Sequence, residues 1–293
     1  DDTVKIGYLP SDHDAALFVA DAQGKYAEKN ITTELVQFNN GGDLMTAMAS
    51  GDIDIGYAGI TPVMSSISQG VPVKVVSGAQ IEGSALVAGK NSGINSVADL
   101  KGKTVATPGE ATIQNMLLTS ALTQAGVSTN DVEFTTMKAA QMTDALKAGQ
   151  VDAMIIWEPY ASIAVKNGDG KLIETSGEII PGHPCCCVVA REDFINNHPE
   201  ELKKVLAAHE NATAFTNENP AEAAACLPED IVPDKDLQAR IKSFSCPRFL
   251  QVEFSRCFHI HEKCHPKDFL RCRVYFLFVA IFELLSNQKA RRL

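Results

Sequence analysis

The stretch AMASGDIDIGYAG (47–59) decides the fold, because a second stretch, ALKAGQVDAMIIW (145–157), repeats its plan. Each stretch runs from a helix-forming segment through a glycine turn and an aspartate into an apolar strand. A plan that recurs about 100 residues later predicts two lobes of the same architecture.

The sequence around each stretch alternates between short apolar runs and segments with helical spacing. In the first round we expect strands at 4–9, 33–38, 53–57 and 73–78 and helices at 15–28, 44–50 and 61–69. In the second round we expect strands at 84–89, 104–106, 132–136 and 151–157 and helices at 113–125, 141–148 and 159–166. Asp43 is the expected cap of the second helix, and Thr61 followed by Pro62 is the expected start of the third. This alternation predicts a parallel sheet covered by helices in each lobe.

The chain then returns towards the first lobe. An apolar run at 185–190 precedes a long helix at 199–217. If that run crosses back, the chain passes between the lobes twice, and two crossings form a hinge beside a cleft. The expected divisions are 1–83 for the first part of lobe 1, 84–184 for lobe 2, 185–245 for the return to lobe 1, and 246–293 for an atypical tail.

Composition excludes several classes of protein. The 293 residues, with 45% hydrophobic content, suffice for two domains with buried cores. Residues 1–245 carry a net charge of −15, which argues against nucleic acid and anionic membranes as partners. The longest apolar stretch, 274–285, is too short to span a bilayer and contains Glu283. A chain that begins without an apolar leader is expected to be either cytosolic or the product of signal-peptide removal.

The tail at 246–293 differs from the preceding chain. It has no glycine, a net charge of +5, seven of the 13 phenylalanines and four of the eight cysteines. It is either a separate module or a segment foreign to the parent fold, and we favour the second interpretation. Its cysteines and histidines at 257–272 are of a type that binds zinc, but their spacing matches no standard zinc pattern, so we assign no metal site there.

Five segments together resemble one family. The segments at 5–30, 44–73, 96–112, 145–162 and 188–200 are similar, in the same order, to the nitrate/sulfonate/taurine-type periplasmic binding proteins of ABC importers. The resemblance covers about residues 4–245 and implies a type II periplasmic-binding-protein fold, in which each of two lobes is a mostly parallel sheet flanked by helices. It also implies a monomer without cofactor or enzymatic activity that closes on a small ligand and docks to an ABC permease. Its expected location is periplasmic or extracellular, with a lipoprotein anchor as one possibility.

Two alternatives share this fold. The synthases that make the thiamine pyrimidine carry an iron-associated cysteine run, which Cys185-Cys186-Cys187 resembles. Where those enzymes have the pyridoxal-phosphate lysine, the consumed histidine and a fourth cysteine, this sequence has Ala58, Pro62 and Val189. This sequence therefore lacks three chemical groups that those enzymes have. A periplasmic sensor domain is the other alternative.

The ligand site is expected at the carboxyl ends of the strands, where helices begin and their free N–H groups point outward. The candidate ligand-binding residues are Ser11, Asp12, His13, Asn40, Gly59, Thr61, Gln80, Glu82, Gly83, Gly109, Glu110, Ala111, Thr112, Trp157, Glu158 and Cys185. Thr61 and Thr112 could instead be only helix caps, and the cysteines could be small buried side chains.

Charge and aromatic content suggest the class of ligand. Asp12, Glu82, Glu110 and Glu158 all fall in these segments, and no arginine precedes Arg191. Four carboxylates near the site would oppose an anion. We therefore rank a neutral heterocycle, an amine or a zwitterion above nitrate or a simple sulfonate. The pyrimidine precursors of thiamine fit this description, with Trp157, the single tryptophan, as the expected stacking surface.

Overall fold

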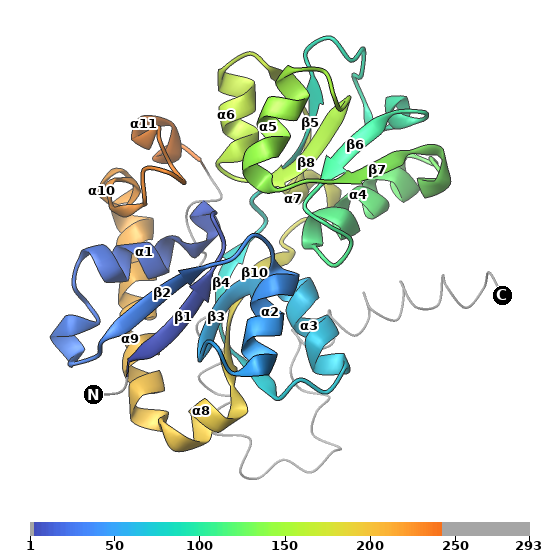
Figure 1. The fold of residues 1–293 in the computed structure, drawn as a ribbon. Helices are drawn as coiled ribbons and strands as arrows, with labels where there is room; N and C mark the ends of the chain where they lie inside the picture. Colours follow the sequence, from blue (N-terminus) through green and yellow to red (C-terminus); the bar gives the residue numbers. More distant parts are fainter. Residues whose placement is uncertain (1–2, 242–293) are drawn as a thin grey trace. The chain divides into compact units, whose positions relative to one another are not determined.

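The computed structural model describes residues 3–241, and the tail with its cysteine and histidine cluster lies outside the described residues. Residues 3–241 form two five-stranded sheets flanked by helices (Figure 1). The expected two-lobed α/β fold is therefore confirmed. Within the described part of the chain, no helix combines the length and apolar content that crossing a membrane requires.

The two sheets have the same topology. The first has the order β2 (Thr33–Gln37), β1 (Val4–Tyr8), β3 (Ile55–Gly59), β10 (Pro184–Arg191), β4 (Val73–Ile81). The second has the order β7 (Glu133–Thr136), β6 (Thr104–Thr107), β8 (Ala153–Trp157), β5 (Ser84–Gly89), β9 (Gly170–Thr175). In each sheet one strand, β10 or β5, lies antiparallel between its two neighbours. The sheets are thus mostly parallel, with a single reversed strand in the same place.

Eleven α-helices lie within residues 3–241. They are α1 (Ala15–Ala22), α2 (Gly41–Ser50), α3 (Ile60–Ser68), α4 (Ile113–Gln124), α5 (Ala139–Lys147), α6 (Tyr160–Lys166), α7 (Ser176–Ile179), α8 (Glu192–Asn197), α9 (Pro199–Glu218), α10 (Pro220–Cys226) and α11 (Lys235–Gln238). Successive residues of β3 point to opposite faces of the first sheet, and helices lie against both faces. Gly56 faces α2, since a Cβ there would lie 2.7 Å from Leu44, while Tyr57 on the opposite face contacts His209 of α9.

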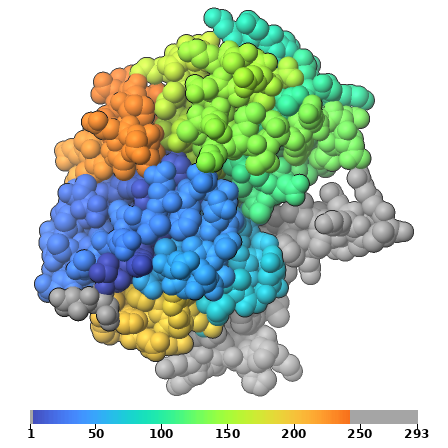
Figure 2. Space-filling view, in the orientation of Figure 1, coloured from blue at the N-terminus to red at the C-terminus, as the bar shows by residue number. Residues whose placement is uncertain are grey.

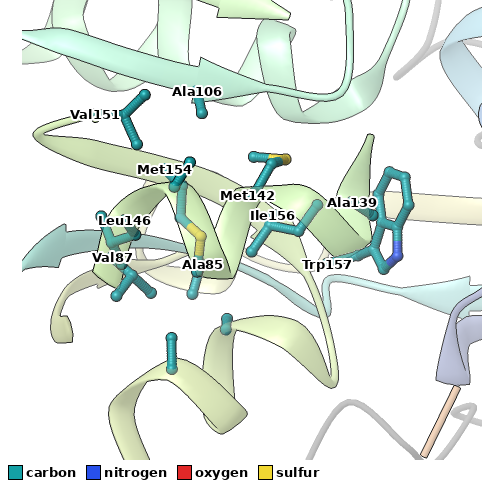
Figure 3. Close-up of a cluster of buried hydrophobic side chains, with 13 residues drawn as sticks. Ala85, Val87, Ala106, Ala139, Met142, Leu146, Val151, Met154, Ile156 and Trp157 are labelled. Carbon is teal, nitrogen blue, oxygen red and sulfur yellow. The ribbon is translucent and has the colours of Figure 1, made fainter. Parts of the chain in front are cut away.

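The second lobe has a continuous apolar core. Val87 of β5, Met154 and Ile156 of β8, and Met142 and Leu146 of α5 pack together (Figure 3). All five side chains are at most 3% exposed, and the alternating positions of β8 provide the strand side of this core. Trp157 closes the cluster at the end of β8, so that its ring lies where the core meets the candidate site.

The segment after α9 contacts both lobes. Lys166 of α6 forms an ion pair with Asp234, just before α11, and Gln238 of α11 donates a hydrogen bond to Asp12 at 2.7 Å. Figure 2 shows this segment in orange beside the yellow-green and blue surfaces of the two lobes. The end of the described chain therefore holds the two lobes together.

Several predicted details were wrong. Asn40, not Asp43, caps α2, and its side chain accepts from the Asp43 N–H at 3.0 Å. Thr61 is not an N-cap, because α3 begins one residue earlier at Ile60 and Gly59 occupies the cap position. Helix α1 ends at Ala22 instead of Glu28, because Gly24 adopts φ +67°. The prediction also lacked strand β9.

Candidate functional site

A small cavity lies between the lobes, with a volume of about 20 Å³. The first lobe lines it with Leu9, Ser11, His13, Asp14, Gly41, Gly59, Pro62, Cys185 and Cys186, and the second lobe with Thr112, Ile113, Gln114 and Trp157. Among the described residues, this lining contains no lysine or arginine. That space is about enough for one water molecule.

Three helix N-termini converge on the cavity. Gly41 is the first residue of α2, Gly59 is the cap of α3, and Thr112 is the cap of α4. The first two helices approach closely, since a Cβ on Gly41 would lie 2.5 Å from Pro62. Free N–H groups and the positive ends of three helix dipoles favour a negative group in the space between them.

Hydrogen bonds join the two lobes beside the cavity. The Trp157 indole N–H donates to the Pro10 carbonyl at 3.2 Å, and the Ser11 hydroxyl donates to the Glu158 carbonyl at 3.3 Å. The His13 Nε2–H donates to the carbonyl of Gly83, on the first crossing, at 2.8 Å. These contacts hold the lobes in the arrangement that closes the cavity.

His13 lies against two thiols. Its Nδ1 is 3.5 Å from the Cys185 Sγ and 3.4 Å from the Cys186 Sγ, and the two sulfurs are 3.8 Å apart. Consecutive strand residues normally point to opposite faces. Here β10 contains an irregularity between Pro184 and Cys186, which pair with the adjacent residues Ile81 and Gln80 of β4. Such a bulge redirects a side chain, and it brings both thiols to the same side.

Comparison with models of known protein families identifies the family of this chain. The model of the NMT1-like family matches residues 1–227. This chain belongs to the NMT1-like family.

The family assignment agrees with individual relatives. The chain is 34% identical to the taurine-binding periplasmic protein of Escherichia coli over 63% of this chain and 58% of that protein. Among solved structures, the ligand-binding component of an ABC-type import system from Staphylococcus aureus, with zinc bound, has a TM-score of 0.76 at 22% identity and covers 91% of this chain and 94% of its own. The alkanesulfonate-binding protein SsuA of Xanthomonas axonopodis, bound to MOPS, has a TM-score of 0.70 at 23% identity, with 81% and 84% coverage. These structures share the two-lobed fold of the NMT1-like chain.

A more distant relative is an enzyme. The 4-amino-5-hydroxymethyl-2-methylpyrimidine phosphate synthase of Legionella pneumophila is 24% identical over 75% of this chain and 71% of the enzyme. The NMT1-like chain thus has both binding proteins and an enzyme among its relatives in sequence.

The structure brings together six of the sixteen predicted site residues of this NMT1-like protein. Ser11, His13, Gly59, Thr112, Trp157 and Cys185 line the cavity. Asp12, Asn40, Thr61, Gln80, Glu82, Gly83, Gly109, Glu110, Ala111 and Glu158 lie outside its lining. Several of the second group support the first, because Asn40 caps α2 and the Gly83 carbonyl holds His13.

Asp12, Glu82, Glu110 and Glu158, the four carboxylates that the sequence places in segments around the site, lie outside the lining of this cavity. Glu110 is exposed, and Glu82 accepts from the Gly182 N–H at 2.7 Å. Asp12 is bonded to Gln238, and Glu158 accepts from the Ser162 hydroxyl at 2.9 Å. The electrostatic argument against an anionic group is therefore weaker for this cavity than the sequence suggested.

One carboxyl that the sequence analysis missed does line the cavity. Asp14 is buried and accepts from the Leu9 N–H at 2.9 Å. Burial raises the pKa of Asp14 to about 7, and burial followed by the nearby Asp12 raises the pKa of Glu158 to about 7. Near neutral pH, both groups are therefore protonated in part of the molecules, which reduces the negative charge at the site.

Other lining residues also escaped the sequence analysis. They are Leu9, Gly41, Pro62, Ile113, Gln114 and Cys186. Most of them directly follow a strand or begin a helix, so the rule of strand ends and helix starts could have identified them. Cys186 could not be found this way, because the bulge that redirects it has no signature in the run of three cysteines.

Proposed function

We propose that this chain is the solute-binding subunit of an ABC importer, which captures a small anionic or zwitterionic organic solute between its lobes and delivers it to a membrane permease. It acts as a monomer in the periplasm or outside the cell. The observation that carries the proposal is the convergence of three helix N-termini, from both lobes, on one cavity between the lobes. Binding proteins for taurine and alkanesulfonates among its relatives support the same class of solute.

Lobe closure supplies the capture mechanism. The small cavity admits an organic solute only when the lobes separate, and the two crossings provide the hinge. Glu82 and Gly83 have φ values of +54° and +84°, and the Glu82 N–H bonds to the carbonyl of His183 on the return crossing at 3.0 Å. Closure then excludes water and strengthens each polar contact around the solute.

The groups around the cavity support a role in binding instead of catalysis. Ala58 and Pro62 stand where the resembling synthases have their lysine and histidine, and the cavity lining contains no lysine. Incubation with pyridoxal phosphate and ferrous iron, followed by mass spectrometry of small molecules, tests this point. We expect no pyrimidine product, and a product in one-to-one yield with the protein would establish the enzyme.

Isothermal titration calorimetry of the full chain tests the binding function. Taurine, an alkanesulfonate, nitrate and a hydroxymethylpyrimidine are titrated separately. We expect one-to-one binding of taurine or the alkanesulfonate. Binding of the hydroxymethylpyrimidine alone would contradict the anionic part of the proposal, and binding of none of the four would contradict the solute class as a whole.

A matched pair of variants tests the role of the helix N-termini. Thr112→Asp keeps a side chain that caps α4 but adds a negative charge to the cavity. Two like charges about 5 Å apart repel by roughly 3 kcal/mol at an effective dielectric constant of about 20, so sulfonate affinity should fall at least tenfold. Ser128→Asp is the control, because Ser128 caps an exposed turn away from the cavity. Equal affinities of the two variants would exclude this part of the mechanism.

A further inference from the structure

His13, Cys185 and Cys186 have the chemistry of a metal site. All three are buried, and their ligand atoms lie within 4.8 Å of one another. Imidazole nitrogen and thiolate sulfur are the ligands that zinc prefers in proteins. This cluster faces the cavity, and its three residues are not among the cysteines and histidines at 257–272.

The spacing of the ligand atoms matches tetrahedral coordination. With Zn–S and Zn–N bonds of about 2.3 and 2.05 Å, tetrahedral angles place two sulfurs roughly 3.8 Å apart and a sulfur and a nitrogen roughly 3.5 Å apart. The observed separations are 3.8 Å between the sulfurs and 3.5 and 3.4 Å from the sulfurs to the His13 Nδ1. An ion can therefore be accommodated without moving the three side chains.

The surroundings of His13 favour the same role. Its Nε2–H donates to the Gly83 carbonyl at 2.8 Å, so in the neutral ring the lone pair of Nδ1 is available to an ion beside the two sulfurs. Histidines that bind metals usually donate their second ring N–H in this way. The Asp12 Oδ1, buried and without a hydrogen-bond partner among the described residues, lies 3.8 Å from the same Nε2.

We propose that His13, Cys185 and Cys186 bind a zinc-like ion whose fourth coordination position opens into the cavity. Three ligands with an open fourth position are the arrangement of sites that bind an exogenous group, whereas purely structural zinc sites use four protein ligands. The fourth ligand is a donor atom of the captured solute, such as an amine or a carboxylate. This last step rests on the proposed solute-binding function, whereas the metal site itself does not.

Cobalt(II) is a suitable probe, because a tetrahedral cobalt site with thiolate ligands has intense visible absorption bands. The full chain is reduced, freed of metal with a chelator and titrated with cobalt(II) and zinc(II) in the absence of oxygen. We expect the bands to appear on addition of one equivalent of cobalt and to disappear when zinc displaces it. Absence of thiolate–cobalt bands in the reduced, folded protein would overturn the proposal.

Cysteine substitutions distinguish metal binding at this cluster from metal binding at other thiols. Cys185→Ser and Cys186→Ser should each lower cobalt affinity at least about 100-fold, since loss of an outer-shell partner alone commonly costs 10- to 100-fold. Cys226→Ser, at a half-buried cysteine outside the cluster, should retain the site, and so should the tail variant Cys257→Ser/Cys264→Ser. Bands that survive in Cys186→Ser, or that vanish in the tail variant, would place the metal elsewhere.

A conservative replacement controls for misfolding. His13→Cys should retain metal in a three-thiolate site, with the charge-transfer bands shifted and strengthened, whereas His13→Ala should lose the bands. If His13→Ala kept the bands while circular dichroism showed an intact fold, His13 would not be a ligand.

Solute titrations with and without metal distinguish the two proposals. If solute binds with the same affinity to the metal-free and zinc-loaded protein, the metal–solute contact is wrong and the binding function stands. If zinc binds at the cluster but no solute binds in either form, the metal site stands and the binding function fails. We expect solute affinity to rise at least tenfold when zinc is bound.

Discussion

Protonation of His209 should make the stability of this protein depend on pH. The His209 ring is 2% exposed, with its Nδ1 2.9 Å from the Tyr57 hydroxyl and its Nε2 2.9 Å from the Gly78 carbonyl. A carbonyl only accepts, so Nε2 carries the proton and Nδ1 accepts from Tyr57. The neutral ring therefore satisfies both contacts, and burial lowers the pKa of His209 from 6.5 to about 4.

The size and sign of the effect follow from this difference in pKa. Above pH 6.5 the ring is neutral in both the folded and the unfolded state. Between pH 6.5 and about pH 4 only the unfolded state takes up the proton, so the free energy of unfolding falls by about 1.4 kcal/mol for each pH unit. The loss reaches roughly 3 kcal/mol and stops below the folded pKa, which is a large part of a typical stability of about 5–15 kcal/mol.

Urea unfolding followed by circular dichroism measures this effect. The free energy of unfolding is compared between the wild type and His209→Gln, which cannot titrate, from about pH 7.5 to pH 4.5. The wild type should lose stability relative to the variant as the pH falls. Tyr57→Phe is the control, since it removes a hydroxyl but keeps the buried histidine, and it should retain the wild-type pH dependence. A constant difference between the wild type and His209→Gln would refute the reasoning.

Three further predictions concern the site and its supports. Trp157 is the single tryptophan and donates to the Pro10 carbonyl across the lobes, so solute binding should change the fluorescence of the protein, and Trp157→Phe should abolish the signal. Asn40→Ala removes the cap of α2 and should lower the free energy of unfolding by about 1 kcal/mol in urea titrations, whereas Asn40→Asp should not. Gly83→Ala places a side chain at φ +84° and should cost about 1 kcal/mol in the same assay; an unchanged stability would show that this crossing relaxes freely.

The sequence predicted most of the fold for identifiable reasons. The glycine turns and aspartates of the two repeated stretches mark equivalent positions, so both lobes could be recognised. Strand β9 was missed because Leu172 at its centre is 44% exposed and the strand also carries the charged residues Lys171 and Glu174. The reversed direction of β10 was not predictable either, because a run of small apolar residues reads the same in either direction.

The site was predicted less completely than the fold. Strand ends and helix starts located Ser11, Gly59 and Thr112, because these positions follow from chain order alone. The directions of Glu82 and Glu158 depend on partners such as Gly182 and Ser162 that the linear pattern does not reveal. A carboxylate near a site in sequence is therefore not evidence of a carboxylate in the site.

The reversed strands also have a consequence for the order in which the chain is made. Strand β10 separates β3 from β4 in the first sheet, yet Pro184 emerges from the ribosome about 125 residues after Gly59. At synthesis rates of about 5–20 residues per second, the amino-terminal sheet stays divided for roughly 6–25 seconds. The second lobe, whose strands are nearly consecutive in the chain, can assemble during that interval. The second lobe can therefore complete its sheet before the first lobe does, although the first lobe contains the earlier part of the sequence.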